Sequence, residues 1–467
     1  MKGVISGIIV TLLLVSMSAL AFNIKQAKAA HTTIIVPDEF PTIQAAINDA
    51  SAGDTIYVRN GTYFEDVIVN KSVSLIGEDR NKTIIDGNKT GNVLQVTADN
   101  VNVTGFTIQN AGSTWPNDFG VDLTSRKNCK IENCTVQDCE YLVYITYALD
   151  NTVLDNIITN ASSYGYAMYI SYYSRNNMII NNTVSGSDDG IHIEEDSQDN
   201  LVAYNRITSI GYEGIYVLSS NSNVIVHNQV SFSGHAVPGM TYPGIRLMYS
   251  SNTTVADNTI LNCTGGIMTY SKYSDPPASN NTIEGNTIEN DEYGIILQQE
   301  GVARNTNDQI SQNTLENNAY GIYLSGVDNN TFYHNNIIGS LNAQATVENC
   351  TNIWDDGYPS GGNYWSDYKG ADSNHDGIGD TPYIVDKDNI DHYPLMQPWT
   401  RIVPKGPGDL NGDGVVDILD VVIAATAYGS VKGSPKWNQF ADLAPPYGKI
   451  NMLDLVTIIF YYGKKYH

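Results

Sequence analysis

An acidic cluster in the middle of the chain contains the residues best suited to catalysis. Residues 188–196 hold five carboxylates and one histidine, and Asp189 and Glu213 each precede a glycine of a recurring Gly-Ile pair. If these pairs lie on successive coils, the two carboxylates are about 5 Å apart, the spacing of a retaining glycosidase pair. The alternative is a set of solvated acidic turns on an acidic protein. The candidate catalytic residues are Asp189, His192, Glu194, Glu213 and Arg246.

Tyrosine is the second chemical signal, because the chain has 31 Tyr against 9 Phe. When the Gly-Ile pairs are aligned, the position two residues after the glycine holds Asp122, Tyr144, Tyr169, His192, Tyr216, Arg246, Met268, Ile296 and Tyr323. Strand alternation places this column outside, with about 4.8 Å between coils. Flat sugar faces stack well on phenol rings, so the predicted substrate-binding residues are Tyr144, Tyr169, Tyr216 and the nearby Tyr249. The alternative is that Tyr is simply favoured at half-exposed strand positions.

A calcium-loop pattern begins at Asp409. Oxygen ligands occupy loop positions 1, 3, 5, 9 and 12, a backbone carbonyl serves at position 7, and Gly414 provides the sharp turn, as a seven-coordinate Ca²⁺ requires. These ligands are Asp409, Asn411, Asp413, Val415, Asp417 and Asp420. The alternative is a calcium hairpin with a purely structural role.

A weaker second copy of this loop follows Asp442. Alignment on Gly448 retains Asn451 and Asp454, but Pro445, Pro446 and Tyr447 replace early ligands and one residue is inserted. We therefore expect one firm calcium site in the C-terminal region, with the second open.

Another acidic loop lies at residues 372–380, where Asp372, Asn374, Asp376 and Asp380 occupy positions 1, 3, 5 and 9. Tyr383 stands where a bidentate acid is needed, so this loop predicts either a structural calcium clamp or a solvated turn.

Repeats of 22 to 30 residues organise the region that holds the catalytic candidates. Each repeat has an Asn-apolar segment, a turn, and a Gly-Ile pair that opens an alternating strand. This length fits one coil of a β-solenoid, in which stacked Asn side chains form a hydrogen-bonded ladder. The expected ladder residues are Asn133, Asn156, Asn181, Asn205, Asn228, Asn258, Asn286, Asn313 and Asn335.

The open N-terminal end of a solenoid needs a cover. Residues 41–50 predict a short helix with Ile43, Ala46, Ile47 and Ala50 on one face. Strands are expected at 55–58, 67–69 and 73–76.

The opening Pro-Thr-Ile-Gln-Ala-Ala-Ile, the Asn and Gly-Ile coils, and Gly-Asn-Tyr-Trp-Ser-Asp-Tyr at 362–368 resemble the NosD-like, pectin-lyase-fold β-helix proteins. This resemblance implies a right-handed parallel β-helix over residues 32–400. The Asp409 loop, with Asp at position 12, resembles a type I dockerin over residues 409–463. That resemblance implies a small α-helical calcium-binding domain that docks to a cohesin-type partner through Ile418 and Leu419, mirrored by Met452 and Leu453.

Composition limits the partners. The formal net charge of −25 argues against nucleic acid, which needs clustered cations. Eight scattered histidines argue against copper handling, despite the NosD likeness. Cations, polysaccharide and cell-surface glycans remain as expected partners.

The N-terminus predicts export. Residues 1–29 read as a signal peptide with an apolar core and a small-residue cleavage site, or as an uncleaved anchor. Residues 401–408 form a linker. The predicted functions are a secreted polysaccharide-binding β-helix held in place by its dockerin, a glycoside hydrolase or polysaccharide lyase, and a structural cell-surface glycoprotein.

Overall fold

A computed structural model describes residues 32–112, 118–162, 165–235, 240–272, 277–300, 304–400, 405–410, 412, 414–432, 437–445 and 447–466. The predicted signal peptide lies outside these ranges. Within them, no helix is both long enough and apolar enough to cross a membrane.

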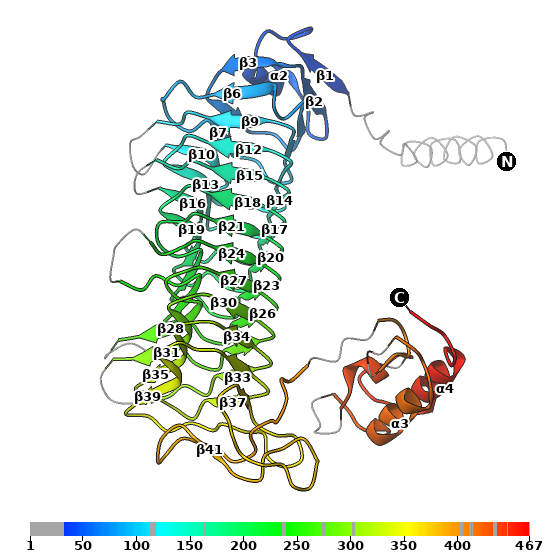
Figure 1. Ribbon diagram of the computed structural model, residues 1–467. Coiled ribbons are helices and arrows are strands. Elements are labelled where there is room, and N and C mark those ends of the chain that lie inside the picture. The colour runs from blue at the N-terminus through cyan, green and yellow to red at the C-terminus, as the bar shows by residue number, and fades with distance from the viewer. Residues whose placement is uncertain are drawn as a thin grey trace, which may run out of the picture. The chain divides into compact units, whose positions relative to one another are not determined.

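The fold is a parallel β-solenoid of about 13 turns, followed by a few short helices near the C-terminus (Figure 1). Each turn of chain adds one strand to each of three sheets, A, B and C, which contain 13, 13 and 12 strands. The chain divides into two compact units, residues 1–254 with 260–271 and residues 255–259 with 272–467. The division falls within β26 (Thr254–Ala256) of sheet A and β27 (Thr259–Leu261) of sheet B.

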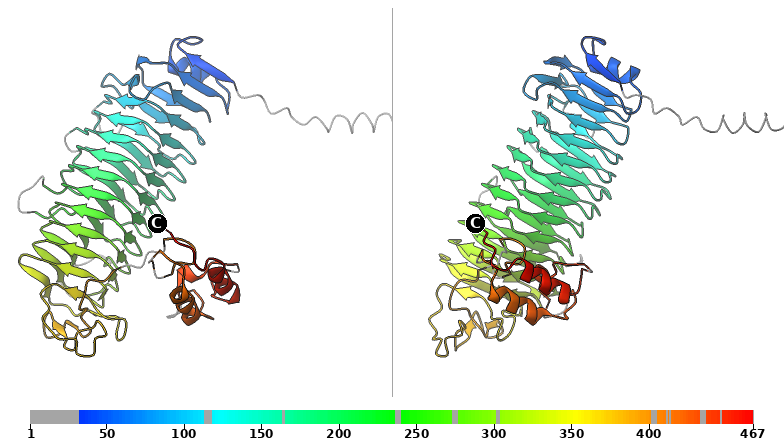
Figure 2. Two further views of the ribbon diagram at one scale, coloured as in Figure 1. Left: turned by 45° about the vertical axis from the view of Figure 1, so that its right-hand side comes forward. Right: turned by 90° about the vertical axis from the view of Figure 1, so that its right-hand side faces the viewer.

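The first unit contains short strands that pair in parallel with the strands one turn before and after (Figure 2). Sheet A has β1 (Thr33–Val36), β2 (Thr55–Val58), β5 (Ser74–Gly77), β8 (Asn102–Thr104), β11 (Lys130–Glu132), β14 (Thr152–Leu154), β17 (Met178–Ile180), β20 (Leu201–Ala203) and β23 (Val224–Val226). Sheet B has β3 (Gly61–Phe64), β6 (Thr83–Asp86), β9 (Thr107–Gln109), β12 (Thr135–Gln137), β15 (Ile157–Thr159), β18 (Thr183–Ser185), β21 (Arg206–Thr208) and β24 (Gln229–Ser231). Sheet C has β4 (Val67–Val69), β7 (Leu94–Val96), β10 (Phe119–Asp122), β13 (Tyr141–Thr146), β16 (Tyr166–Ser171), β19 (Asp189–Glu194), β22 (Ile215–Leu218), β25 (Ile245–Met248) and β28 (Ile267–Ser271).

The predicted N-terminal cover is confirmed as helix α2 (Ile43–Asp49). The Thr42 hydroxyl caps it by accepting the Ala45 N–H at 3.1 Å, and Ile43, Ala46 and Ile47 are fully buried. Two of the three predicted strands match β2 and β4 residue for residue, and the third is displaced by one residue to Ser74–Gly77.

Asparagine ladders tie successive coils together at two corners. In one, the Asn156, Asn182 and Asn205 side chains each donate Nδ2–H to the Oδ1 of the next asparagine at 3.0 Å, the third of these bonds reaching Asn228. The prediction of Asn133 and Asn181 for this ladder is wrong by one residue, because the ladder positions are Cys134 and Asn182. Asn133 and Asn181 instead hold the adjacent left-handed turn, with φ of 49° and 54°.

A second ladder, which the sequence reading missed, joins Asn151, Asn177, Asn200 and Asn223 at the turn before sheet A, with Nδ2 to Oδ1 distances between 3.0 and 3.2 Å. Buried amides in both ladders are satisfied by their neighbours, so the ladders fix the register of each coil.

In the second unit the three-strand coil continues. It is followed by turns that contain Trp354 and Trp365, both of which are fully buried. Its strands are β29 (Thr282–Glu284), β33 (Gln309–Ser311) and β37 (Thr331–Tyr333) in sheet A; β30 (Thr287–Glu289), β34 (Thr314–Glu316), β38 (Asn336–Ile338) and β40 (Tyr364–Trp365) in sheet B; β31 (Tyr293–Gln299), β35 (Tyr320–Ser325) and β39 (Ala343–Glu348) in sheet C; and the pairs β32 (Arg304–Asn305) with β36 (Val327–Asp328) and β41 (Tyr383–Ile384) with β42 (Ile390–Asp391).

The C-terminal helices α3 (Ile418–Ala427) and α4 (Met452–Phe460) pack with the short helix η1 (Gln439–Ala441) around a small apolar core. Both long helices begin with the same capping box, in which Asp417 and Asn451 are the N-cap residues and Asp420 and Asp454 bond back to the cap N–H. The two halves of this region are therefore structural repeats of each other.

Candidate functional site

Sheet C carries the predicted outward column. Backbone register pairs Asp122 with Tyr144, Tyr144 with Tyr169, Tyr169 with His192, His192 with Tyr216, Tyr216 with Arg246, and Arg246 with Met268. Ile191 and Ile193, on either side of His192, are fully buried in the core. The column therefore lies on the opposite face of the sheet, and the predicted alignment of these coils is confirmed.

The glycine of the Gly-Ile pair is required by the close stacking of coils. A Cβ on Gly190 would lie 2.1 Å from the carbonyl oxygen of Gly214 on the next coil, a distance that no side chain tolerates. Gly190 N–H donates to the Glu213 carbonyl at 3.1 Å, so Asp189 and Glu213 occupy neighbouring coils, as the sequence predicted.

Aromatic rings form two stacked rows on this face. In the first row, the ring of Phe119 stacks on that of Tyr144 with centroids 4.0 Å apart, and Tyr144 stacks on Tyr169 at 5.4 Å. Beside them, Tyr141 stacks on Tyr166 at 5.2 Å. Burial raises the pKa of Tyr141 and of Tyr144 to about 12, so both phenols stay neutral hydrogen-bonding groups at physiological pH.

His192 and Glu194 form the centre of the polar cluster that follows the aromatic rows. The His192 Nε2 atom lies 3.1 Å from Glu194 Oε2, and the Tyr169 hydroxyl donates to the other oxygen of the same carboxylate. Burial acts to raise the pKa of Glu194, but the bonds from His192 and Tyr169 outweigh it and hold this pKa below its usual range. Glu194 is therefore a stabilised carboxylate.

Asp189 lies on the same strand as Glu194, but its pKa is displaced in the opposite direction. Burial raises its pKa to about 7, and the nearby Glu213 and Asp188 carboxylates add to the rise while His192 opposes it. A carboxyl group that holds a proton at neutral pH can act as a general acid, and two carboxyls with displaced pKa values are typical of an acid and base pair.

Glu213, the predicted partner of Asp189, is held by Arg246. It is 4% exposed, and one oxygen accepts a hydrogen bond from Arg246 Nη1 at 2.7 Å. The Arg246 guanidinium lies over the Tyr216 and Tyr270 rings, 5.5 and 5.1 Å from their centroids. This ion pair holds the Glu213 carboxylate in place. The two carboxyl groups whose pKa values are displaced in opposite directions are Asp189 and Glu194.

Tyr249 is not in the column. It lies in the turn after β25 with φ of 52°, the position that Tyr147 and Tyr172 occupy in earlier coils with φ of 50° and 49°. Tyr147 and Tyr172 stack at 5.2 Å. Their rings flank the N-terminal end of the aromatic rows.

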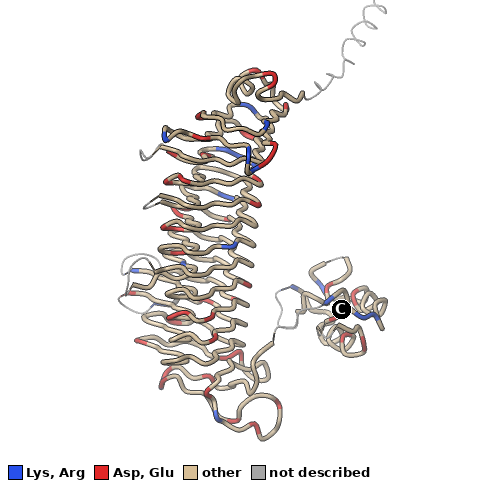
Figure 3. Tube along the Cα trace, turned by 45° about the horizontal axis from the view of Figure 1, so that its top comes forward, with Lys and Arg blue, Asp and Glu red and all other residues tan. Residues whose placement is uncertain are grey.

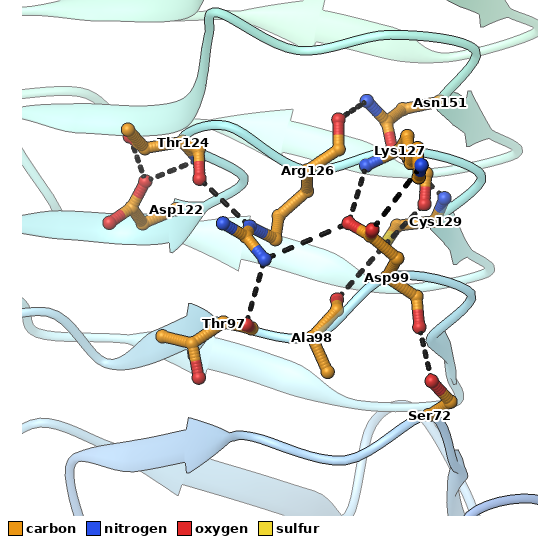
Figure 4. Close-up of polar contacts among 10 residues, drawn as sticks. All are labelled: Ser72, Thr97, Ala98, Asp99, Asp122, Thr124, Arg126, Lys127, Cys129 and Asn151. Atoms are coloured by element: carbon orange, nitrogen blue, oxygen red, sulfur yellow. Dashed lines mark hydrogen bonds and ion pairs between the residues drawn. The ribbon is translucent and has the colours of Figure 1, made fainter.

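A cleft of ≈ 540 Å³ opens beside these rings, and we call it the Asp122 cleft. Asp122 anchors it by accepting hydrogen bonds from the Thr124 N–H at 2.8 Å, from Asn92 Nδ2 at 3.3 Å and from Gln95 Nε2 at 3.2 Å. Figure 4 shows Arg126 beside Asp122, reaching back to Thr97 and Asp99.

The sequence reading missed Asn92 and Gln95, because their coil lacks the Gly-Ile pair used for alignment. It missed Arg126 because this residue lies in the turn after β10 and not in the column. Extending the column back by one coil would have found Gln95, which pairs in register with Asp122.

The C-terminal acidic residues gather around two turns. Asp409 Oδ2 accepts the Gly414 N–H at 3.1 Å, and buried Oδ1 has no hydrogen-bond partner among the described residues. Asp420 is fully buried, and its oxygens accept the N–H groups of Leu410 and Asp417. Predicted ligands Asn411 and Asp413 lie outside the described residues, and Val415 pairs with Lys465 in a β-bridge.

The second loop repeats this arrangement around a residue the sequence reading left out. Asp442 Oδ2 accepts the Gly448 N–H at 2.7 Å, and buried Oδ1 is again unpartnered among the described residues. Asp454 accepts the N–H groups of Leu443 and Asn451, as Asp420 does in the first loop. The inserted residue had hidden the equivalence of Asp442 with Asp409.

In the loop at 372–380, the side chains converge on backbone N–H groups. Asp372 accepts the N–H groups of Asp376 and Gly377 at 3.2 and 3.0 Å, and Asp380 accepts the Ser373 N–H at 2.9 Å. Asn374 Nδ2 donates to Asp376 Oδ2 at 2.9 Å. Across the described part of the chain, no three His, Cys, Asp or Glu side chains are grouped closely enough to form a metal site.

Comparison with known proteins gives partial matches. A right-handed β-helix region model matches residues 169–337, and a model of the periplasmic copper-binding protein NosD matches residues 47–237. A cell surface glycoprotein of Methanothermus fervidus is 28% identical over 370 residues, which are 76% of this chain and 55% of that protein. A probable ABC transporter binding protein NosD of Stutzerimonas stutzeri is 36% identical over 84 residues, 18% of each chain. The chain thus spans about half the length of the first relative, and less of the second.

Among solved structures, the catalytic domain of a GH87 α-1,3-glucanase in complex with tetrasaccharides superposes with a TM-score of 0.57 and 15% identity, over 73% of this chain and 70% of that one. This likeness concerns the fold. The chain is a right-handed β-helix protein that is NosD-like over residues 47–237.

Proposed function

We propose that this protein binds polysaccharide on the outer face of sheet C. The observation that supports the proposal is the pair of stacked aromatic rows, Phe119–Tyr144–Tyr169 and Tyr141–Tyr166, which lead into the His192 cluster. Neutral phenols beside buried carboxylates offer both a stacking surface and hydrogen-bonding groups, as sugar rings need.

The distribution of charge agrees with a neutral or cationic ligand. Acidic side chains outnumber basic ones along the coils, where Lys and Arg are few and scattered (Figure 3). A polyanion such as nucleic acid would meet repulsion on this surface.

The test is retention of the full chain on immobilised α-glucan, β-glucan, arabinogalactan and polygalacturonate, with a Tyr166→Ala variant for comparison. Saturable retention that Tyr166→Ala weakens supports the proposal. Absence of retention on every polysaccharide would contradict it and favour a structural surface protein.

A second candidate function is hydrolysis of a glycosidic bond at Asp189 and Glu194. The specific observation is that their pKa values are displaced in opposite directions within one strand. The Asp189 carboxylic acid would give its proton to the glycosidic oxygen as the C–O bond breaks. The Glu194 carboxylate would stabilise the developing positive charge or assist attack on the sugar carbon, and water would complete the hydrolysis.

Hydrolysis is tested by incubating the same polysaccharides with the protein and measuring reducing ends together with the absorbance of unsaturated products. New reducing ends without that absorbance identify a hydrolase, and the absorbance identifies a lyase. Loss of product in both Asp189→Asn and Glu194→Gln would assign the two residues.

For the C-terminal region we propose a dockerin-like calcium-binding module. The buried Oδ1 atoms of Asp409 and Asp442 have no hydrogen-bond partner among the described residues, and each loop contains a glycine at positive φ. This arrangement suits a hard cation that takes carboxylate oxygen. Asp409, Asp417 and Asp420 would hold the ion in the first loop together with Asn411, Asp413 and the Val415 carbonyl. Calcium would there supply the charge that keeps the loop closed.

The helices of this module present apolar side chains to solvent. Ile418, Leu419, Met452 and Leu453 are between 54% and 59% exposed. An exposed apolar face of this kind fits a protein partner, for which a cohesin-type domain is the proposed occupant. Pull-down with a cohesin panel, with Leu419→Asp plus Leu453→Asp as the disrupted variant, tests this docking.

The proposed site of action is outside the cytoplasm. Two observations support it: the matching relative is named a cell surface glycoprotein, and the matching family model is described as periplasmic. Cell fractionation with an antibody to the chain tests this location.

A further inference from the structure

The Asp122 cleft shares Tyr144 with the predicted substrate-binding residues, but most of its lining was not predicted from the sequence. Its floor is the outer face of β7, β10 and β13, and its rim is the turns that follow those strands. The lining residues are Asn92, Gln95, Val96, Thr97, Phe119, Asp122, Thr124, Ser125, Arg126, Tyr144, Thr146, Tyr147 and Tyr172.

The charged side chains of this lining already have hydrogen-bond or ion-pair partners within the protein. Arg126 donates from Nε to the Thr124 carbonyl at 3.0 Å and from Nη1 to the Thr97 carbonyl at 2.8 Å, and Asp99 lies 3.7 Å away. Asp122, 4% exposed, accepts from Thr124, Asn92 and Gln95. Neither charge needs an ion from the ligand, so the cleft suits an uncharged one.

The groups that remain for a ligand are amides and hydroxyls. Gln95 uses one N–H on Asp122, and its Oε1 accepts no hydrogen bond from the described residues. On the same wall the Thr124 hydroxyl donates to Asp122 Oδ1 and lies 3.2 Å from the Thr146 hydroxyl, so this oxygen offers a ligand an acceptor rather than a donor. These donors and acceptors match sugar hydroxyls, which both donate and accept.

An aromatic platform completes the rim. Tyr147 and Tyr172 are 53% and 37% exposed, and their rings stack at 5.2 Å with an interplanar angle of 15°. Both occupy the left-handed region, where bulky side chains are uncommon and Asn or Gly is easier to place. The stacked and partly exposed rings offer a flat apolar surface at the rim of the cleft.

The cleft lies along the same face as the His192 cluster. Register places Asp122 three coils before His192, a separation of about 14 Å at ~4.8 Å per coil. We propose that the Asp122 cleft is a binding subsite for uncharged sugar units, and that a neutral polysaccharide runs from it along the aromatic rows to Asp189 and Glu194. This inference rests on the proposed binding of polysaccharide by sheet C.

The experiment measures Kd of the full chain by affinity electrophoresis in gels containing soluble α-glucan, β-glucan, arabinogalactan or polygalacturonate. The variants are Tyr147→Ala, Tyr172→Ala and Gln95→Ala, all on the cleft. The matched control is Tyr204→Ala, since Tyr204 is 58% exposed, has φ of 58° and stacks on His227, but lies in a turn between sheets A and B.

We expect a neutral polysaccharide to bind, each cleft tyrosine variant to weaken Kd about tenfold, and Tyr204→Ala to leave Kd unchanged. Cleft variants with wild-type Kd, while Tyr166→Ala weakens binding, would overturn the subsite and leave the proposed function standing. Preference for polygalacturonate would overturn the assignment to neutral sugars. Absence of binding by the unaltered chain to all four polysaccharides would overturn the proposed function, and the subsite with it.

Discussion

Asp189 and Glu194 lie on one strand, β19, five residues apart, and their carboxyl groups have pKa values displaced in opposite directions. Alternation along the strand puts His192 on the same face as Glu194, and its Nε2 atom lies 3.1 Å from Glu194 Oε2. One short strand thus holds a carboxylic acid, a carboxylate and an imidazole, and burial is the main cause of the raised pKa of Asp189.

The first prediction concerns the pH dependence of cleavage. Because the pKa of Asp189 is about 7, its acid form is lost above that pH, and the rate should fall about tenfold per pH unit on the alkaline side. Because the pKa of Glu194 is lowered, Glu194 stays ionised at pH values where a glutamate is usually protonated. The rate should therefore stay constant on the acidic side of the profile.

Initial rates between pH 4 and 9 on a cleaved polysaccharide measure this profile. Asp196→Asn, an exposed acid in the same segment, serves as the control and should keep the wild-type profile. A rate that rises through pH 8 would exclude Asp189 as the general acid.

The second prediction concerns the buried ion pair of Arg246 and Glu213. Arg246→Met leaves the Glu213 carboxylate buried without its partner, so the free energy of unfolding should fall by about 3–5 kcal/mol. The double variant with Glu213→Gln should recover most of the loss, as measured by urea denaturation. Arg59→Met breaks an exposed pair with Asp38 and should leave the urea midpoint in place. An equal loss in the single and double variants would show that the ring contacts of Arg246, not its charge, stabilise the fold.

The third prediction concerns Asp308, an acid within an asparagine ladder. Its backbone N–H donates to Asn330 Oδ1 and its own Oδ1 accepts the Asn281 N–H, both at 2.7 Å. Burial raises the pKa of Asp308 to about 8, so the folded state holds its proton more tightly than the unfolded chain. The free energy of unfolding should therefore fall by about 1.4 kcal/mol per pH unit between about pH 4 and 8.

Asp308→Asn supplies the side chain used by the neighbouring coils and should remove that slope. Urea denaturation of both proteins at several pH values makes the comparison. Identical slopes would mean that Asp308 is ionised in the folded protein.

The fourth prediction concerns calcium in the C-terminal module. If the Asp409 loop binds Ca²⁺, free ion at 100 times Kd should stabilise the module by about 2.7 kcal/mol. Limited proteolysis and thermal unfolding with calcium or with EGTA measure the effect, and Asp409→Asn should abolish it.

Asp372→Asn is the control for the other acidic loop, and it should leave this response intact. Calorimetry counts the ions bound, so a second ion lost on Asp442→Asn would extend the site to the second loop.

The periodicity of the chain predicted the solenoid well, because glycine and asparagine serve local needs that recur in every coil. Gly190 has no room for a side chain, and Asn205 bonds to its counterparts above and below. The one-residue error at Asn133 and Asn181 arose because Asn also suits the left-handed turn that precedes the ladder.

The site was less accessible to sequence reasoning, since its chemistry depends on burial and on partners from other coils. Asp189 and Glu213 looked alike in sequence, yet an arginine 33 residues away binds Glu213 and leaves Asp189 as the group with the raised pKa. The Asp122 cleft was not predicted for a similar reason, because Gln95 and Arg126 belong to neighbouring coils and line one cleft only once those coils stack.

The asparagine ladders have a consequence for how such a protein changes over time. The coils from Asn156 to Asn228 are joined by the same side-chain amide hydrogen bonds, whatever residue stands on the outer face of sheet C. Substitutions in the outer column can therefore alter recognition while leaving the framework in register, and gain or loss of a whole coil alters the reach of the surface by a fixed step. The ladder keeps the spacing between coils constant, so under the proposed function the number of coils would set the length of polysaccharide that sheet C can contact.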